Sequence, residues 1–254
     1  MILHIPHSQR HISPAYRNLF VLDDADLHRE QRRLVDAYTD ELFQFEDAMH
    51  ITFKHSRLLV DVERFPDDAN EPMSSVGMGA IYTQTSNGQA LKRTLTETER
   101  EGLMSLYENH HKALTAVVDN ELQSQGVALI VDCHSFPSEP LPCDMSQKKP
   151  RPDFCIGVDE LHTPTKLVKE LIKQIRSWGY AAAINDPYAG TLVPSDYYQI
   201  NIKVKSVMIE VNRSLYMNEI TGEKLTEFND IKLRIHKLLS LIQTYSRCKG
   251  IMTP

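Results

Sequence analysis

One stretch near the middle of the chain limits the possible folds more than any other: residues 126–137, which read GVALIVDCHSFP. The five consecutive apolar residues at 127–131 are typical of a strand that is covered on both faces of a sheet. Proline cannot continue a central strand, so this one ends before Pro137. Three reactive side chains stand near that end: Asp132, His134 and Ser135. In open α/β sheets, ligands bind at the carboxyl ends of the strands, so we expect these side chains to face an active site.

A second predicted strand ends in the same way. Residues 1–5 are mostly apolar, and Pro6 stops them immediately before His7 and Ser8. Taken singly, His134 is explained equally well as a hydrogen-bonded structural histidine, and His7 as a solvated loop residue. Two strands that each deliver a histidine and a serine favour a shared site instead.

Two further apolar runs end in charged residues. Residues 58–60 precede the charged segment 61–64, and a strand predicted at 204–211 carries Glu210 at its end. An unpaired carboxylate at the end of a buried strand is costly, so Glu210 calls for a cationic partner. Four predicted strands thus end in polar clusters, and we expect those ends to meet at one edge of the sheet.

Apolar residues at helical spacing predict helices between these strands. The segment 25–48 has this spacing, with Asp36 in its middle, either as a solvated residue or as an inward carboxylate held by a cation. A capping box at 96–99 opens a long helix that Gly126 terminates. Shorter elements are expected as follows: helices near 163–179 and 226–244, and strands near 154–158 and 180–184.

Strands that alternate with helices, without an internal repeat or a linker, predict an α/β fold. We expect a single domain over residues 1–254, built on a mixed, mostly parallel sheet flanked by helices. The irregular segment 66–93 is long for a spacer in a compact domain, which favours a functional flap.

The composition excludes several classes of protein. The chain has 34 acidic and 28 basic residues, a net charge of -6, which argues against a dedicated nucleic-acid binder. No apolar run approaches the roughly 18 residues of a membrane span, and the N-terminus lacks the pattern of a signal peptide. The cysteines at 133, 143, 155 and 248 form no CxxC pair, so we expect reduced thiols and a cytoplasmic location.

The strand-end residues suit one particular chemistry. Two histidines and one carboxylate, with a fourth position open to water, form the ligand set of a catalytic zinc site. Zinc lowers the pKa of its water to about 7 and polarises a carbonyl, while a carboxylate off the metal takes the proton. Arginines nearby would hold the carboxylates of a small anionic substrate in a bidentate geometry.

Several segments resemble the N-formylglutamate amidohydrolase family. The similarity covers most of the chain and includes residues 7–8, 35–40, 77–82, 132–137, 153–157 and 210–216. The motifs around His134 and Glu210 are the most specific. The resemblance implies a fold shared with zinc carboxypeptidases and N-acetylmuramoyl-L-alanine amidases. It also implies hydrolysis of an N-acyl amide, such as an N-formyl group, on glutamate or a similar acidic amino acid.

The resemblance implies roles for individual residues. The residues are the zinc ligands His7, Asp36 and His134, the general base Glu210, and the substrate-binding residues Arg64, Asn212 and Arg213. Asp36 is favoured as the third ligand because the related amidases take it from their first helix, and Glu63 is the alternative. The arginines would otherwise form ordinary ion pairs at strand ends. Gln9 stands where the family usually has glycine, and Glu63 where asparagine is expected, which leaves the acyl group open.

Other interpretations remain at this stage. A peptidase or amidase of the same fold, acting on peptides or cell-wall stems, would need a broad cleft and usually an export signal. A non-catalytic binding protein would have no need of Glu210 beside the two histidines. A serine hydrolase would need a GxSxG turn, which the sequence lacks. The oligomeric state is left open.

Overall fold

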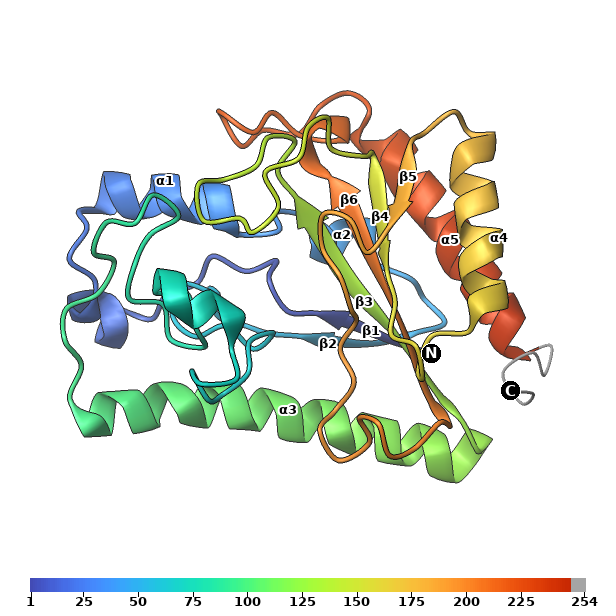
Figure 1. The fold of residues 1–254 in the computed structure, drawn as a ribbon, viewed down its shortest axis with the longest axis horizontal. Helices are drawn as coiled ribbons and strands as arrows, with labels where there is room; N and C mark the ends of the chain where they lie inside the picture. Colours follow the sequence, from blue (N-terminus) through green and yellow to red (C-terminus); the bar gives the residue numbers. More distant parts are fainter. Residues whose placement is uncertain (248–254) are drawn as a thin grey trace.

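The computed structural model describes residues 1–247, and in this part of the chain six strands form one mixed sheet (Figure 1). The strands are β1 (Ile2–Ile5), β2 (Met49–Thr52), β3 (Ala128–Phe136), β4 (Phe154–Gly157), β5 (Ala182–Ile184) and β6 (Val204–Asn212). Their spatial order is β2-β1-β3-β6-β4-β5. The first four of these are parallel, whereas β4 runs antiparallel to β6 and parallel to β5. The predicted α/β class with a mixed, mostly parallel sheet is confirmed.

Helices cover both faces of the sheet. They are α1 (Asp24–Leu34), α2 (Thr39–Leu42), α3 (Glu97–Gln125), α4 (Thr165–Ser177) and α5 (Phe228–Arg247), with short 3-10 turns η1 (Pro14–Leu19), η2 (Pro72–Val76) and η3 (Arg213–Leu215). Helices α4 and α5 lie side by side against one face, and α3 runs along the other side of the molecule (Figure 1).

Alternation along the strands separates a purely apolar face from a functional one. Leu129, Val131 and Cys133 of β3 point into the core beneath α4 and α5. The residues between them point the other way, because successive side chains of a strand face opposite sides. There, Ile130 packs against Leu114 of α3, and the polar residues of β3 follow nearer its carboxyl end. Asp132, His134 and, through its pairing with His134, Glu210 of β6 therefore share the face that α3 covers.

The long helix has the boundaries that the sequence predicts. The hydroxyl of Thr96 accepts from the amide of Glu99, whose carboxylate in turn accepts from the amide of Thr96. At the other end Gly126 adopts a φ of 72°, a conformation that costs glycine little. The predicted strands at 154–158, 180–184 and 204–211 and both C-terminal helices are confirmed with small shifts at their ends.

The helix predicted over 25–48 is confirmed only in its first part, α1, and is wrong beyond it, because the chain leaves the helix at Val35 and resumes only a single turn at α2. Asp36 therefore lies in a break rather than in mid-helix. Its amide donates to the carbonyl of His7 at 3.0 Å, and Tyr38 reverses the chain with a φ of 68°. The apolar spacing continues through the break because Val35 and Leu42 are both buried, so spacing alone does not reveal it.

The strand predicted at residues 58–60 is also wrong. These residues form a turn in which the amide of Leu59 donates to the carbonyl of Ser56, and they are buried in a second apolar cluster with α1. The strand of this region is β2, at the edge of the sheet, whose half-exposed residues lack a clear apolar pattern. The apolar run at 58–60 is explained by its burial in this cluster. The turn still places Asp61 next to the site.

Cys133, Cys143 and Cys155 are free thiols, as expected, and Cys248 lies outside the described residues. Within residues 1–247, none of the helices has the length and apolar character needed to cross a membrane.

Candidate active site

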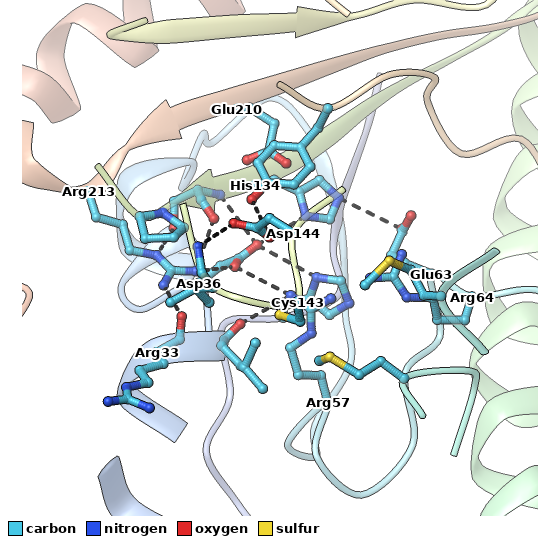
Figure 2. Close-up of a pocket in the computed structure, with 18 of the residues that line it drawn as sticks. Arg33, Asp36, Arg57, Glu63, Arg64, His134, Cys143, Asp144, Glu210 and Arg213 are labelled. Carbon is cyan, nitrogen blue, oxygen red and sulfur yellow. Dashed lines mark hydrogen bonds and ion pairs between the residues drawn. The ribbon is translucent and has the colours of Figure 1, made fainter. Parts of the chain in front are cut away.

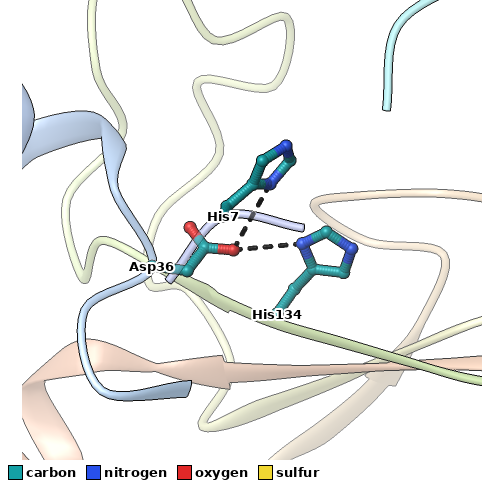
Figure 3. Close-up of side chains that lie close together, drawn as sticks. All are labelled: His7, Asp36 and His134. Atoms are coloured by element: carbon teal, nitrogen blue, oxygen red, sulfur yellow. Dashed lines mark hydrogen bonds and ion pairs between the residues drawn. The ribbon is translucent and has the colours of Figure 1, made fainter. Parts of the chain in front are cut away.

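Three buried side chains converge beyond the carboxyl end of β1. His7 follows β1, His134 lies on β3, and Asp36 enters from the break between α1 and α2 (Figure 3). The Nδ1 atom of His134 lies 3.0 Å from Oδ2 of Asp36, and Nδ1 of His7 lies 3.6 Å from the same oxygen. One possible ligand atom from each residue falls within 4.8 Å of the others. Each side chain is at most 6% exposed, so the cluster is shielded from solvent.

The Nε2 atom of each histidine, on the far side of the ring from Asp36, contacts another carboxylate. The Nε2 atom of His7 lies 2.7 Å from Asp61, and Nε2 of His134 lies 3.0 Å from Asp132. When Nε2 donates to these acids, Nδ1 is left with a lone pair that faces Asp36. Carboxylates in this position fix the tautomer and the orientation of metal-binding histidines. Within the described residues, Nδ1 of His7 has no hydrogen-bond partner, as expected for a nitrogen reserved for a ligand.

Asp36 is kept ionised by its surroundings. Its Oδ1 accepts from the Nη2 atom of Arg213 at 2.8 Å, and His134 lies on its other oxygen. Burial by itself would raise the pKa of Asp36, but the hydrogen bond with His134, the neighbouring His7 ring and the charge of Arg213 hold it well below the usual value. Asp36 therefore presents a negative charge between the two imidazole rings.

Glu210 lies beside this cluster on the neighbouring strand β6. It occupies the β6 position paired with His134 of β3, so both side chains point to the same face. Its Oε2 atom is buried and has no hydrogen-bond partner among residues 1–247. Burial raises the pKa of Glu210 to about 8, and the positive charge of His134 opposes the rise. A carboxyl group with a pKa near neutrality is suited to taking up and releasing a proton.

A cavity of about 220 Å³ joins these residues (Figure 2). It is lined by His7, Asp36, His134 and Glu210, by four arginines at positions 33, 57, 64 and 213, and by Met73, Met78 and Tyr82 of the long irregular segment. That segment was predicted to be a functional flap, and the structure places part of it in the cavity wall. The cavity wall thus combines four arginines with four carboxylates, at positions 36, 63, 144 and 210.

The four arginines differ in how much of each guanidinium is free. Arg57 bonds Asp61 at 2.7 Å, and Arg213 bonds Asp36, the side chain and carbonyl of Ser135, and the carbonyl of Arg33. By contrast, Nε of Arg64 is buried without a hydrogen-bond partner in the described chain, and the side chain of Arg33 is 44% exposed. Arg33 and Arg64 therefore have the most capacity for a substrate carboxylate.

Six of the seven residues singled out from the sequence line this one cavity, and Asn212 does not. The Nδ2 atom of Asn212 donates to the carbonyl of Pro152, and its Oδ1 accepts from the amide and hydroxyl of Ser214. These bonds place Asn212 at the start of η3, where it caps the turn that carries Arg213.

Glu63, the alternative third ligand, belongs to a neighbouring cluster with His4 and Asp132. Its Oε1 lies 3.0 Å from Nδ1 of His4 and 3.9 Å from Nε2 of His134, on the side of the His134 ring that faces away from Asp36. Burial would lower the pKa of His4, but Asp132 and Glu63 raise it to about 9. The two clusters share Asp132 as their link.

Sequence reasoning placed Asp132 at the site but missed its other supporting residues. His4 could have been found from alternation, since it faces Asp132 from β1. Arg57 and Tyr82, which both bond Asp61, gave no such signal. They come from irregular segments, where no period relates a residue to the sheet.

The sheet and its site define the class of protein: an α/β enzyme with a buried acid–base cavity at the carboxyl edge of parallel strands. A family model described as N-formylglutamate amidohydrolase matches residues 1–217. The chain therefore belongs to the N-formylglutamate amidohydrolase family and is an amidohydrolase.

Solved structures show the same fold. A crystal structure of N-formylglutamate amidohydrolase from Ralstonia eutropha JMP134 superposes with a TM-score of 0.84 at 24% identity, over 97% of this chain and 93% of the other. A gene product of Agrobacterium tumefaciens has a TM-score of 0.62 at 20% identity, over 96% and 91% of the two chains. Among curated proteins, none matches the sequence significantly.

Proposed function

We propose that this protein is a zinc-dependent amidohydrolase that converts N-formyl-L-glutamate, or a similarly acidic N-acyl amino acid, to the free amino acid and the carboxylate of the acyl group. The family supports the reaction. The observation that carries the mechanism is the convergence of two imidazole nitrogens and one carboxylate beside the unpartnered Glu210. A cytoplasmic location stays a prediction.

The residues present fit a divalent cation. His7, Asp36 and His134 would hold it, since two neutral imidazoles and one carboxylate are a preferred set for Zn²⁺. The orphaned Nδ1 of His7 supports this assignment, and so do the carboxylates behind both rings. Asp36 is preferred to Glu63 because it lies on the Nδ1 side of both rings. When bound, Zn²⁺ would supply Lewis acidity, polarising the scissile carbonyl and lowering the pKa of water.

Glu210 is the proposed general base. A positive charge beside Glu210 would lower its pKa and so favour the ionised carboxylate. It then accepts a proton from the attacking water and afterwards gives a proton to the departing amine nitrogen. The C–N bond breaks, the hydroxyl remains on the acyl carbon, and the amino acid leaves as an amine.

The basic side chains would position the acidic substrate. Arg64 is the proposed partner of a substrate carboxylate, and Arg33, which lies across the cavity, is added here because its side chain is partly free. Arg213 is proposed to act chiefly by holding Asp36, because its Nη2 donates to that carboxylate while Nε and Nη1 are taken by Ser135 and by the carbonyl of Arg33. Asn212 is proposed to act by fixing η3 rather than by touching substrate.

The test is formate release from N-formyl-L-glutamate by the purified protein, with the zinc content measured before and after chelation. We expect near-stoichiometric zinc and activity that chelation removes. Glu210→Gln should keep the metal and lose activity by at least about 10²-fold, because the proton acceptor is gone. His134→Ala should lose the metal itself.

Zinc without formate release would point to another acyl group, whereas tight N-formyl-L-glutamate binding without turnover would indicate a non-catalytic relative. A Glu210→Gln variant with normal rates would remove Glu210 from the mechanism. Full activity of the chelated, metal-free protein would overturn the zinc assignment.

A further inference from the structure

A second, larger hollow lies next to the catalytic cavity. It has a volume of about 730 Å³, against about 220 Å³ for the first. One wall is the side of α3 that carries Tyr107, Thr115 and Ala116, and the opposite wall is the loop with Leu192 and Val193. We call this hollow the α3 groove. Nothing in the hydrolysis of a formyl group requires it.

The groove is continuous with the catalytic cavity. Both are lined by Glu63, Arg64, Ala189 and Met208. The floor of the groove includes Asp132 and Met208, which are paired across β3 and β6 two residues before the pair His134 and Glu210. Two residues of a strand correspond to about 7 Å, so the groove begins about 7 Å along the sheet from the proposed reaction centre.

The wall formed by the 189–193 loop is fixed in place. The amide of Leu192 donates to Oδ2 of Asp132 at 3.1 Å. Gly157 lies under the same loop, where a Cβ atom would come within 2.1 Å of the carbonyl oxygen of Gly190. The groove is therefore a built feature of the sheet and its loop. It carries an open apolar rim as well, since Phe65 is 56% exposed there.

Charge decides which end of a substrate could enter the groove. The groove is lined by six carboxylates, at positions 63, 108, 119, 132, 159 and 196, and by only two basic residues, Arg64 and Lys112. The catalytic cavity has four arginines against four carboxylates, at positions 36, 63, 144 and 210, and Arg33, Arg57 and Arg213 lie away from Glu63 (Figure 2). The carboxylates of an amino acid are attracted to the arginines and repelled by the groove. The uncharged acyl chain is left to point into the groove.

We propose that the α3 groove binds the apolar acyl chain of N-acyl amino acids, so that the enzyme hydrolyses substrates with acyl groups longer than formyl. This inference rests on the proposed amide hydrolysis and extends its substrate class. Water adds across the amide: its hydroxyl bonds to the acyl carbon, the C–N bond breaks, and the amine takes the proton. The products are a fatty acid and the free amino acid.

The experiment compares N-formyl-, N-acetyl-, N-butanoyl- and N-octanoyl-L-glutamate as substrates of the zinc-loaded protein. The rate of glutamate release is measured for each compound. Fully burying one methylene is worth a factor of about 4. Partial burial of four methylenes should therefore raise kcat/KM by about tenfold or more from butanoyl to octanoyl. A fall in kcat/KM with chain length, alongside good turnover of N-formyl-L-glutamate, would overturn the groove proposal alone.

Two tryptophan variants of α3 locate the effect. Ala116→Trp fills the groove and should lower the ratio of octanoyl to formyl turnover by about tenfold, the value of slightly less than two fully buried methylenes. Ala113→Trp changes the same residue type at another exposed position of the same helix, but Ala113 does not line the groove, so the ratio should stay as in the wild type. Equal ratios in both variants would contradict the assignment.

A binding measurement separates this proposal from the proposed reaction. Calorimetry with the Glu210→Gln protein should show N-octanoyl-L-glutamate binding at least about tenfold more tightly than the butanoyl compound, and Ala116→Trp should remove the difference. Chain-length-dependent binding without wild-type turnover would refute the reaction and keep the groove. If N-formyl-glutamyl peptides gain from extension instead, the groove holds the amine side and the proposal is wrong.

Discussion

At the scale of single residues, the site depends on carboxylates that lie behind the proposed ligands. Asp61 holds Nε2 of His7, and Asp61 is itself held by Arg57 and the hydroxyl of Tyr82. Burial would raise the pKa of Asp61, but Arg57 and His7 hold it well below the usual value. His7 is thus oriented through a charged residue that never reaches the cavity.

Asp61→Asn tests this arrangement. Loss of the charge weakens the orientation of His7, and such changes typically lower metal affinity about 10- to 100-fold. We expect that loss in a zinc competition titration with a coloured chelator. Asp24→Asn is the control, because Asp24 is 82% exposed on α1 and should leave the affinity unchanged. An unaltered affinity in Asp61→Asn would show that His7 needs no support.

A second residue-scale prediction concerns Lys92, whose ammonium group is buried. Its Nζ donates to the carbonyls of Leu58 and Tyr82, and burial lowers its pKa from 10.5 to about 7. Between these values the unfolded chain binds the proton and the folded chain does not. The free energy of unfolding due to Lys92 therefore rises with pH in this window, by at most about 1.4 kcal/mol per pH unit.

Denaturant unfolding of the wild type and of Lys92→Met at pH 7 and pH 10 measures this effect. The stability advantage of the wild type should grow between the two values, since the methionine has no proton to release. Lys112→Met, at a side chain that is 72% exposed, supplies the matched control. A difference that is constant with pH would show that the amine stays charged in the folded protein.

At the scale of elements, α3 supports both the sheet and the wall of the groove, and its first turn depends on Thr96. Replacing an N-cap threonine by alanine typically costs about 1 kcal/mol. We expect Thr96→Ala to lower the free energy of unfolding by that amount, and Thr94→Ala, at an exposed position outside the helix, to have little effect. Equal stabilities of the two variants would mean that packing alone fixes the helix.

The elements that the sequence predicts well are those whose own residues carry the pattern. β3 and β6 are almost wholly buried and each contains an unbroken apolar run, at 128–131 and 207–209, while α3 has a capping box and a terminal glycine. The break at Val35 and the turn at 58–60 are different, because they are set by contacts with distant residues. Arg213 bonds Asp36 from 177 positions away, and no local spacing records such a contact.

The same distinction applies to the site. His7, His134 and Glu210 are predicted from their positions at the ends of apolar strands. Asp36 is favoured through the family resemblance, because the sequence around it shows only helical spacing. The free and engaged arginines could not be told apart in advance, since that depends on which carboxylates lie beside each guanidinium. Residue type predicts the chemistry of this cavity, and only the packed fold shows which groups are left unpaired.

At the scale of the whole molecule, the proposed ligands tie together segments that are far apart in the sequence. A ligand that binds only the folded state stabilises it by about 2.7 kcal/mol at 100 times its dissociation constant. For a chain of this size, that should raise Tm by about 5–10 °C. Zinc added to the metal-free protein should give this shift, and His134→Ala should abolish it. His28→Ala, at an exposed position on α1, should behave like the wild type.

The position of β6 has a consequence for synthesis on the ribosome. β6 is the last strand to be made, yet it lies between β3 and β4, which emerge earlier. Until residues 204–212 leave the ribosome, β4 and β5 have no strand through which to join the rest of the sheet. The growing chain also lacks Glu210. The six-stranded sheet can thus be completed only when β6 inserts, and shorter chains lack the proposed base.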